Sequence, residues 1–142
     1  MEHNFNKRYI GRFLAISIPA WFVMAFLPLP PIFNVVMLAV VAYFVGRRFA
    51  KDNVRSPVAS EQNRFSGISF VAIVAVMATL AFLSYMVLPP ADQAAMIAPF
   101  QEKSWSVKIF GTLIAALMVW GCISSGFAIG ARLYMKKLSK GV

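Results

Sequence analysis

The side chains able to carry out acid–base, redox or metal chemistry are few, and their spacing limits what they can do. The acidic residues are Glu2, Asp52, Glu61, Asp92 and Glu102. A carboxylate inside a membrane helix is costly and marks proton-coupled transport, but all five lie outside the long uncharged stretches. Cys122, the single cysteine, forms no disulfide within one chain, and His3, the single histidine, offers no histidine pair for a metal or haem.

Nucleophilic catalysis has equally little support. Ser124 and Ser125 lie in a long apolar segment, but a serine nucleophile needs an adjacent general base, and no histidine lies in any such segment. We therefore predict a protein without enzymatic activity, with no catalytic residue, no metal and no cofactor.

The elements that carry these residues are long apolar segments. Hydrophobic residues make up 60% of the chain and charged residues 13%, against about a quarter charged in soluble domains. Uncharged runs cover residues 13–46, 65–91 and 109–131, and each reaches the roughly 20 residues that a helix needs to cross a bilayer. The first run contains the proline-rich segment 27–31, which cannot continue a helix, so it predicts two spans. We expect an all-α, polytopic membrane protein with four transmembrane helices in an antiparallel bundle.

The runs predict the boundaries of a single membrane domain over residues 1–142. We expect spans at about residues 9–27, 32–50, 66–88 and 107–133, a cytoplasmic loop at 51–65 and periplasmic loops at 28–31 and 89–106. Ser56-Pro57 is a helix-start signal, so the third helix should begin before its span. An alternative remains for the first span, because a basic start, a short apolar core and Val23-Met24-Ala25 also resemble a cleaved signal peptide.

Basic residues predict the orientation. All of the 14 Lys and Arg residues except Lys103 and Lys108 fall in three clusters, at residues 7–12, 47–64 and 132–140. Basic loops stay cytoplasmic, so we expect both termini inside a bacterial inner membrane. The net charge of +9 flanks spans and lacks aromatic interleaving, which favours membrane lipids over nucleic acid as partners. The residues expected to contact lipid head groups or a partner are Arg47, Arg48, Lys51 and Arg55.

Small residues in the later spans predict close helix packing. Gly126 and Gly130 form a GxxxG pattern, which lets two helix backbones touch. The residues expected at helix contacts are Ala72, Ala75, Gly121, Ser125, Gly126 and Gly130. We favour packing within the chain, and a homo-oligomer remains the alternative. Asn34 is the one amide in any expected span and predicts an intramembrane polar contact, preferably a hydrogen bond to a neighbouring helix.

The second basic cluster carries a resemblance. The residues concerned are the run 43–50, Arg55-Ser56-Pro57, Glu61, Arg64 and Phe65. This segment resembles an uncharacterised family of small bacterial inner-membrane proteins with four spans, whose members show Pro-Thr followed three residues later by an acidic residue. Val58 replaces that Thr while Glu61 remains, so we expect Ser56 or Ser60 to cap the third helix. The resemblance implies a fold and a location, with no assigned activity.

These observations predict a non-enzymatic inner-membrane protein that acts through protein or lipid contacts. It could protect against a membrane-targeting toxin, or serve as an accessory protein of a membrane complex. The alternative is a small permeation or lipid or solute transport protein without ionisable coupling groups inside the membrane. Its polar stripe would draw on Asn34, Thr79, Ser84, Thr112, Ser124 and Ser125.

Overall fold

The computed structural model describes residues 2–25, 30 and 32–140, and this part of the chain is helical throughout its length apart from short connections. The helices are α1 (Glu2–Ala25), α2 (Ile32–Asn53), α3 (Ala59–Val87), α4 (Pro90–Gln101) and α5 (Trp105–Ser139). No strand occurs in the described ranges, so the predicted all-α class is confirmed. By length and composition, α2, α3 and α5 are long and apolar enough to cross a membrane.

α1 begins earlier than the sequence indicated. The first span was expected from about residue 9, but the helix already starts at Glu2 and runs through Pro19 to Ala25. Its first half is charged and its apolar run starts only at Phe13, so α1 is not one of the three apolar helices of membrane-crossing length. The predicted loop 28–31 lies outside the described residues except for Pro30, whose carbonyl accepts a hydrogen bond from the Phe33 amide at 3.0 Å.

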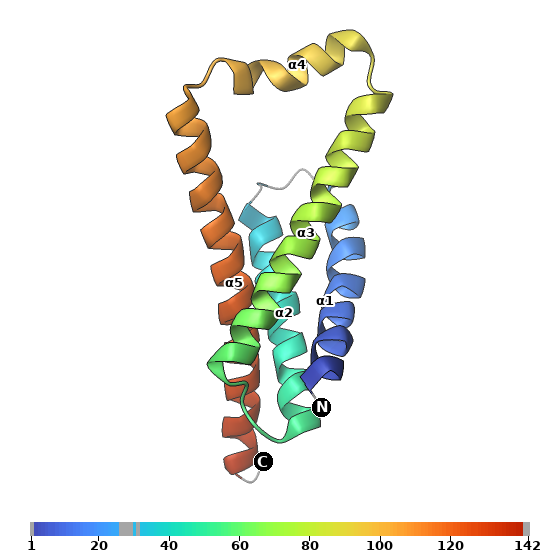
Figure 1. The fold of residues 1–142 in the computed structure, drawn as a ribbon. Helices are drawn as coiled ribbons and strands as arrows, with labels where there is room; N and C mark the ends of the chain where they lie inside the picture. The colour runs from blue at the N-terminus through green and yellow to red at the C-terminus, as the bar shows by residue number, and fades with distance from the viewer. Residues whose placement is uncertain (1, 26–29, 31, 141–142) are drawn as a thin grey trace.

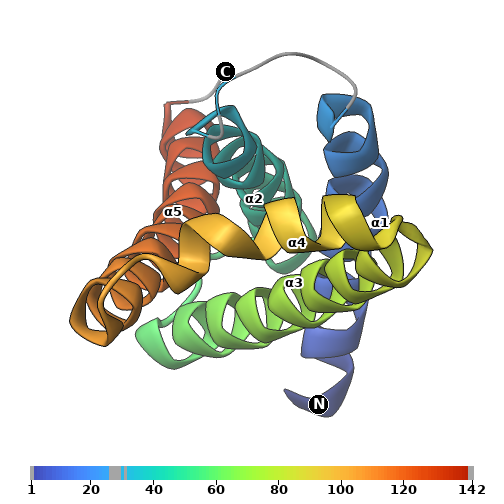
Figure 2. The ribbon, with the colours of Figure 1, turned by 90° about the horizontal axis from the view of Figure 1, so that it is seen from above.

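The four long helices converge at one end and separate toward the other (Figure 1). The start of α1, the end of α5 and the α2–α3 connection lie at the converging end, which therefore gathers the three basic clusters. α4 lies at the opposite end and crosses between the separated ends of α3 and α5 (Figure 2). The most extensive contact is between α2 and α5, while α3 packs on α1 and α5, and α1 also packs on α2.

Aromatic rings fill the converging end. One fully buried phenylalanine comes from each long helix: Phe13 of α1, Phe49 of α2, Phe65 of α3 and Phe127 of α5. The Phe65 and Phe127 rings stack at 4.2 Å between centroids, Phe49 meets Phe127 at 5.7 Å, and Phe13 meets Phe65 edge-on at 5.6 Å. This aromatic cluster joins all four long helices at one level.

Glycines allow α2 and α5 to touch. A Cβ atom built on Gly46, Gly126 or Gly130 would collide with a backbone carbonyl of the facing helix. The three pairs are Gly46 with Phe127, Gly126 with Ala39, and Gly130 with Tyr43. Two of these glycines form the GxxxG pattern, and their contact surface lies within the chain.

The other small residues expected at helix contacts lie elsewhere. Gly121 has open space where a Cβ would stand, Ser125 and Ala75 are exposed, and Ala72 is half-buried. Gly121 precedes Gly130 by nine residues, or two and a half turns, and so lies on the opposite face of α5, and Ser125 points away from the seam that Gly126 and Gly130 share.

Residues 89–106, expected as a loop, contain α4. Pro90 occupies the first helical position and Asp92 lies in the first turn, both of which favour a helix start. The Gln93 side-chain amide donates to the carbonyls of Leu88 at 2.9 Å and Tyr85 at 3.1 Å, so it satisfies acceptors at the end of α3. The two prolines thus end one helix and begin the next.

The expected serine caps of α3 are also wrong. The N-cap residue is Val58, with no side-chain hydrogen bond of its own, and the Glu61 carboxylate accepts the Val58 amide proton at 3.1 Å. The helix starts at Ala59, two residues beyond Pro57. Glu61 supplies half of a capping box, the half that an acidic residue at the third position provides.

Candidate functional site

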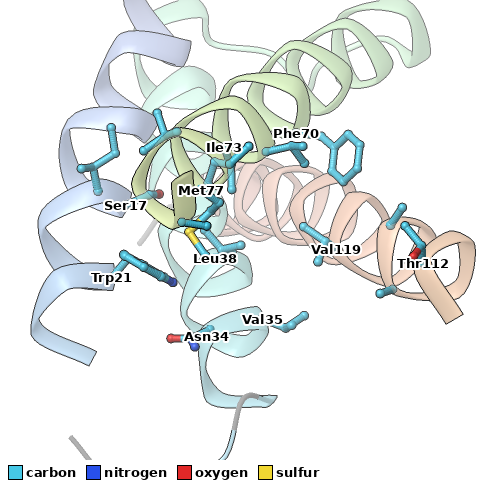
Figure 3. A pocket seen from close by; sticks show the side chains of 17 residues that line it. Ser17, Trp21, Asn34, Val35, Leu38, Phe70, Ile73, Met77, Thr112 and Val119 are labelled. Carbon is cyan, nitrogen blue, oxygen red and sulfur yellow. The ribbon is translucent and has the colours of Figure 1, made fainter. Parts of the chain in front are cut away.

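A cavity opens where the long helices separate. It has a volume of about 630 Å³, is partly open to its surroundings and lies between α1, α2, α3 and α5 (Figure 3). The lining residues are Ser17, Ile18, Trp21, Asn34, Val35, Leu38, Phe70, Ile73, Val74, Val76, Met77, Ala78, Ala81, Thr112, Ala115, Ala116 and Val119. We refer to it as the apolar cavity, because hydrocarbon side chains make up nearly all of its wall.

Short side chains explain why the space stays unfilled. α3 contributes Ala78 and Ala81 to the wall, and α5 contributes Ala115 and Ala116. Small residues of the later spans were expected to let helices pack closely, but at this level α3 and α5 have already diverged (Figure 1). Small residues on facing helices that do not touch leave a void.

Four polar side chains reach the cavity: those of Ser17, Trp21, Asn34 and Thr112 (Figure 3). The Thr112 hydroxyl donates to the Lys108 carbonyl at 2.8 Å within its own helix. The Ser17 hydroxyl is buried and has no hydrogen-bond partner among the described residues. Asn34 also lies in the cavity wall (Figure 3), and its expected hydrogen bond to a neighbouring helix stays a prediction.

The lining determines what the cavity can hold. No lining residue is ionisable at neutral pH, and pockets of this kind bind apolar molecules while a few polar groups fix the orientation. An apolar guest with one hydrogen-bonding group near Asn34 and Ser17 fits this chemistry.

A second group of polar residues lies at the converging end, around Asp52 in the last turn of α2. Three arginines form ion pairs with its carboxylate: Arg48 at 3.1 Å, Arg12 at 3.6 Å and Arg8 at 3.7 Å. The Tyr9 hydroxyl donates to Asp52 at 3.1 Å. The spacing of Arg48 and Asp52, four residues apart on one helix, was a usable sequence signal, whereas the pairing with α1 had none.

The predicted head-group residues divide into two kinds. Arg47 and Lys51 are exposed, and the Arg47 guanidinium lies 6.0 Å from the Tyr134 ring centroid. Arg48 pairs with Asp52, and Arg55 pairs with Glu61. Two of the four predicted contact residues therefore also form ion pairs within the chain.

The Arg55–Glu61 pair fixes the α2–α3 connection. The two guanidinium nitrogens of Arg55 lie 2.6 and 2.7 Å from the two Glu61 oxygens, a bidentate geometry. Glu61 stands in the polar first turn of α3, before the uncharged run that begins at Phe65. The Arg55 hydrogen bonds lower the pKa of Glu61 below its ordinary value, against a smaller opposite effect of burial, and the Val58 amide lowers it further.

One interhelical hydrogen bond carried no sequence signal. The Gln62 side-chain amide donates to the Ser124 hydroxyl at 2.8 Å and joins α3 to α5. Ser124, considered above as a nucleophile, thus has a structural partner. In the described residues no group of three or more His, Cys, Asp and Glu side chains could hold a metal ion.

Comparison of the chain with protein-family models, curated proteins and solved structures gave no match. The resemblance carried by residues 43–65 therefore stays a prediction, and the apolar cavity and the polar group around Asp52 are the features that bear on function.

Proposed function

We propose that this chain is a non-enzymatic protein of the bacterial inner membrane that binds a lipid acyl chain in the apolar cavity. In this proposal α1, α2, α3 and α5 all cross the bilayer and both termini are cytoplasmic. The gathering of the three basic clusters at the converging end supports that orientation, since basic segments stay on the cytoplasmic side. The cavity then lies in the outer half of the membrane.

The observation that carries the proposal is the combination of cavity size and lining. A helix with its side chains is about 10 Å wide and rises 5.4 Å per turn, so 630 Å³ holds little more than one turn. An acyl chain is thinner and flexible, and it enters an apolar space from the surrounding hydrocarbon without losing hydrogen bonds. The size of the cavity therefore favours a lipid chain over a partner helix.

The lining also bears on permeation. A path for ions or water needs a succession of polar groups along its wall, whereas the lining residues other than Ser17, Trp21, Asn34 and Thr112 present apolar side chains. Lipid binding is compatible with lipid transfer, the part of the transport alternative that this wall supports.

The test uses the purified protein in phosphatidylcholine vesicles that contain a lipid with a photoactivatable group on one acyl chain. Irradiation should label cavity residues such as Trp21 and Met77. Ala78→Phe and Ala115→Phe fill the cavity and should abolish that labelling. Ala75→Phe, which adds the same side chain to an exposed position of α3, should leave it unchanged.

Two results would count against acyl-chain binding. Cavity labelling that persists in both filling variants would show that the label reaches these residues from bulk lipid. A photoactivatable amino acid at Val119 that captures a protein instead of a lipid in cells would favour the accessory or immunity role.

A further inference from the structure

Three arginines share one carboxylate at the converging end. Arg48 Nε lies 3.1 Å from Asp52 Oδ1, while Arg12 Nη1 and Arg8 Nη2 lie 3.6 and 3.7 Å from Asp52 Oδ2. Of these, only the Arg48 distance is within the range of a hydrogen bond. One negative charge thus faces three positive ones, and the group keeps an excess of positive charge.

Arg12 has hydrogen-bonding capacity left over. Its Nη1 atom is buried and makes no hydrogen bond with a described residue. Buried donors are normally satisfied by a hydrogen bond, whereas at 3.6 Å the Asp52 carboxylate attracts this nitrogen without accepting a hydrogen bond from it. The Arg8 and Arg48 side chains beside it are 56% and 49% exposed, so an acceptor from outside can reach the group.

The carboxylate at the centre is held in place. Asp52 Oδ2 accepts the Tyr9 hydroxyl at 3.1 Å, and the Asn53 amide donates to the Tyr9 oxygen at 3.2 Å and to the Phe49 carbonyl at 2.9 Å. Asp52 therefore holds the guanidinium groups from α1 and α2 in position, while its single negative charge does not cancel their three positive charges. A preorganised site loses less freedom when a ligand binds.

We propose that Arg8, Arg12 and Arg48, arranged around Asp52, bind the phosphate group of an anionic phospholipid in the cytoplasmic leaflet. Guanidinium groups match the oxygens of a phosphate with paired hydrogen bonds. Arg12 immediately precedes Phe13, where the uncharged run begins, so the group stands at the depth of lipid head groups. Basic pockets between membrane helices on the cytoplasmic side are typical head-group sites.

This inference rests on the membrane orientation proposed above and is independent of the apolar cavity. The arginines lie at the converging end of the bundle, and none of them lines the cavity, which lies further along the helices toward α4. Filling the cavity with Ala78→Phe should leave head-group binding unchanged, and acyl-chain labelling in pure phosphatidylcholine needs no anionic lipid. Failure of one proposal is thus distinguishable from failure of the other.

The test measures how much phosphatidylglycerol the full-length protein retains from mixed phosphatidylglycerol–phosphatidylcholine micelles, by native mass spectrometry. The wild type should retain phosphatidylglycerol in preference to phosphatidylcholine. Arg12→Gln should lower the affinity about tenfold, as expected for loss of hydrogen bonds to a charged group. Arg12→Lys keeps the positive charge but loses the paired guanidinium N–H groups. Its affinity for phosphatidylglycerol should lie between those of the wild type and Arg12→Gln.

Arg132→Gln is the matched control, since it removes one positive charge from an exposed position of α5 at the same end. It should change the affinity less than twofold. Equal losses for Arg12→Gln and Arg132→Gln, with both variants melting like the wild type, would reduce the site to general surface charge and overturn the proposal.

Inorganic phosphate distinguishes the two sources of the ligand chemistry. Because the acyl chains keep the proposed ligand in the micelle next to the site, at a high effective concentration, phosphate at tenfold excess over the lipid should not displace phosphatidylglycerol from the wild type. Displacement would assign the site to a free anion, and absence of any phosphatidylglycerol preference in the wild type would exclude the head-group site itself.

Discussion

The rings of Phe65 in α3 and Phe127 in α5 stack almost in parallel, with 4.2 Å between centroids and 20° between planes. The same two residues also contact Phe13 of α1 and Phe49 of α2, so a single pair of rings links the four long helices. Beyond this level, toward α4, the helices separate and the apolar cavity begins. The aromatic cluster therefore closes the cavity on the side of the converging end.

Removing a ring from this cluster should destabilise the bundle. We expect Phe127→Ala to lower the free energy of unfolding by about 3 kcal/mol, because it leaves a void among four helices. The value lies at the lower end for such changes, since lipid is as apolar as the core and transfer contributes little. Thermal unfolding in detergent measures the change. Phe110→Ala, on an exposed part of the same helix, should have little effect; equal loss would remove the special role of the cluster.

Adding a single methyl group at the α2–α5 contact should destabilise the protein. Gly130→Ala places a Cβ against the Tyr43 carbonyl, so we expect a loss of about 1–3 kcal/mol through overpacking. Gly121→Ala is the matched control, because its Cβ would meet open space and alanine favours the helix. It should leave stability unchanged or raise it slightly. Equilibrium unfolding of both variants in one detergent would decide, and an unaffected Gly130→Ala variant would contradict the contact.

The turn after α2 should gain from a glycine. Val54 has a φ of 52°, a left-handed conformation that costs a β-branched residue about 1–2 kcal/mol. Its amide donates to the Ala50 carbonyl at 2.9 Å, the usual end of a helix that favours glycine. We expect Val54→Gly to raise the melting temperature. Val58→Gly, whose φ is −79°, should lower it, and a fall in both would show that chain entropy outweighs strain.

Acid should weaken the α2–α3 connection. The pKa of Glu61 is lowered in the folded protein, chiefly by Arg55, so the unfolded chain binds a proton more readily. The stabilisation is therefore complete above the ordinary glutamate pKa of 4.5 and is lost as pH falls through the lowered value.

Melting temperatures between pH 7 and pH 3 measure this loss. Glu61→Gln should melt lower at pH 7 and show a smaller fall on acidification than the wild type. Glu102→Gln, at an exposed carboxylate beside α4, should retain the full fall. If Glu61→Gln loses as much melting temperature between pH 7 and pH 3 as the wild type does, another group causes the acid sensitivity.

The sequence predicted the helical class because uncharged runs and charge clusters are local patterns. The GxxxG pattern also pointed to a backbone contact, although Gly46, the partner glycine on α2, carried no comparable signal. The cavity could not be predicted, because the Ala78 and Ala115 side chains become a wall only when α3 and α5 diverge. In the same way, Arg12 meets Asp52 through helix packing across 40 positions of sequence, which no spacing rule reports. α4 was missed because residues 89–106 were expected to form a loop, whereas Pro90 stands at the first position of a helix.

α4 connects the separated ends of α3 and α5 beyond the cavity (Figure 2). None of the extensive helix contacts includes α4, yet it spans the gap between the far ends of α3 and α5 (Figure 2), and its 12 residues measure about 18 Å at 1.5 Å per residue. The length of α4 therefore sets how far apart the adjacent ends of α3 and α5 can lie. Adding or deleting one turn of α4 should change the distance between the far ends of α3 and α5 by about 5 Å. The width of the cavity would then depend on a segment that does not line it.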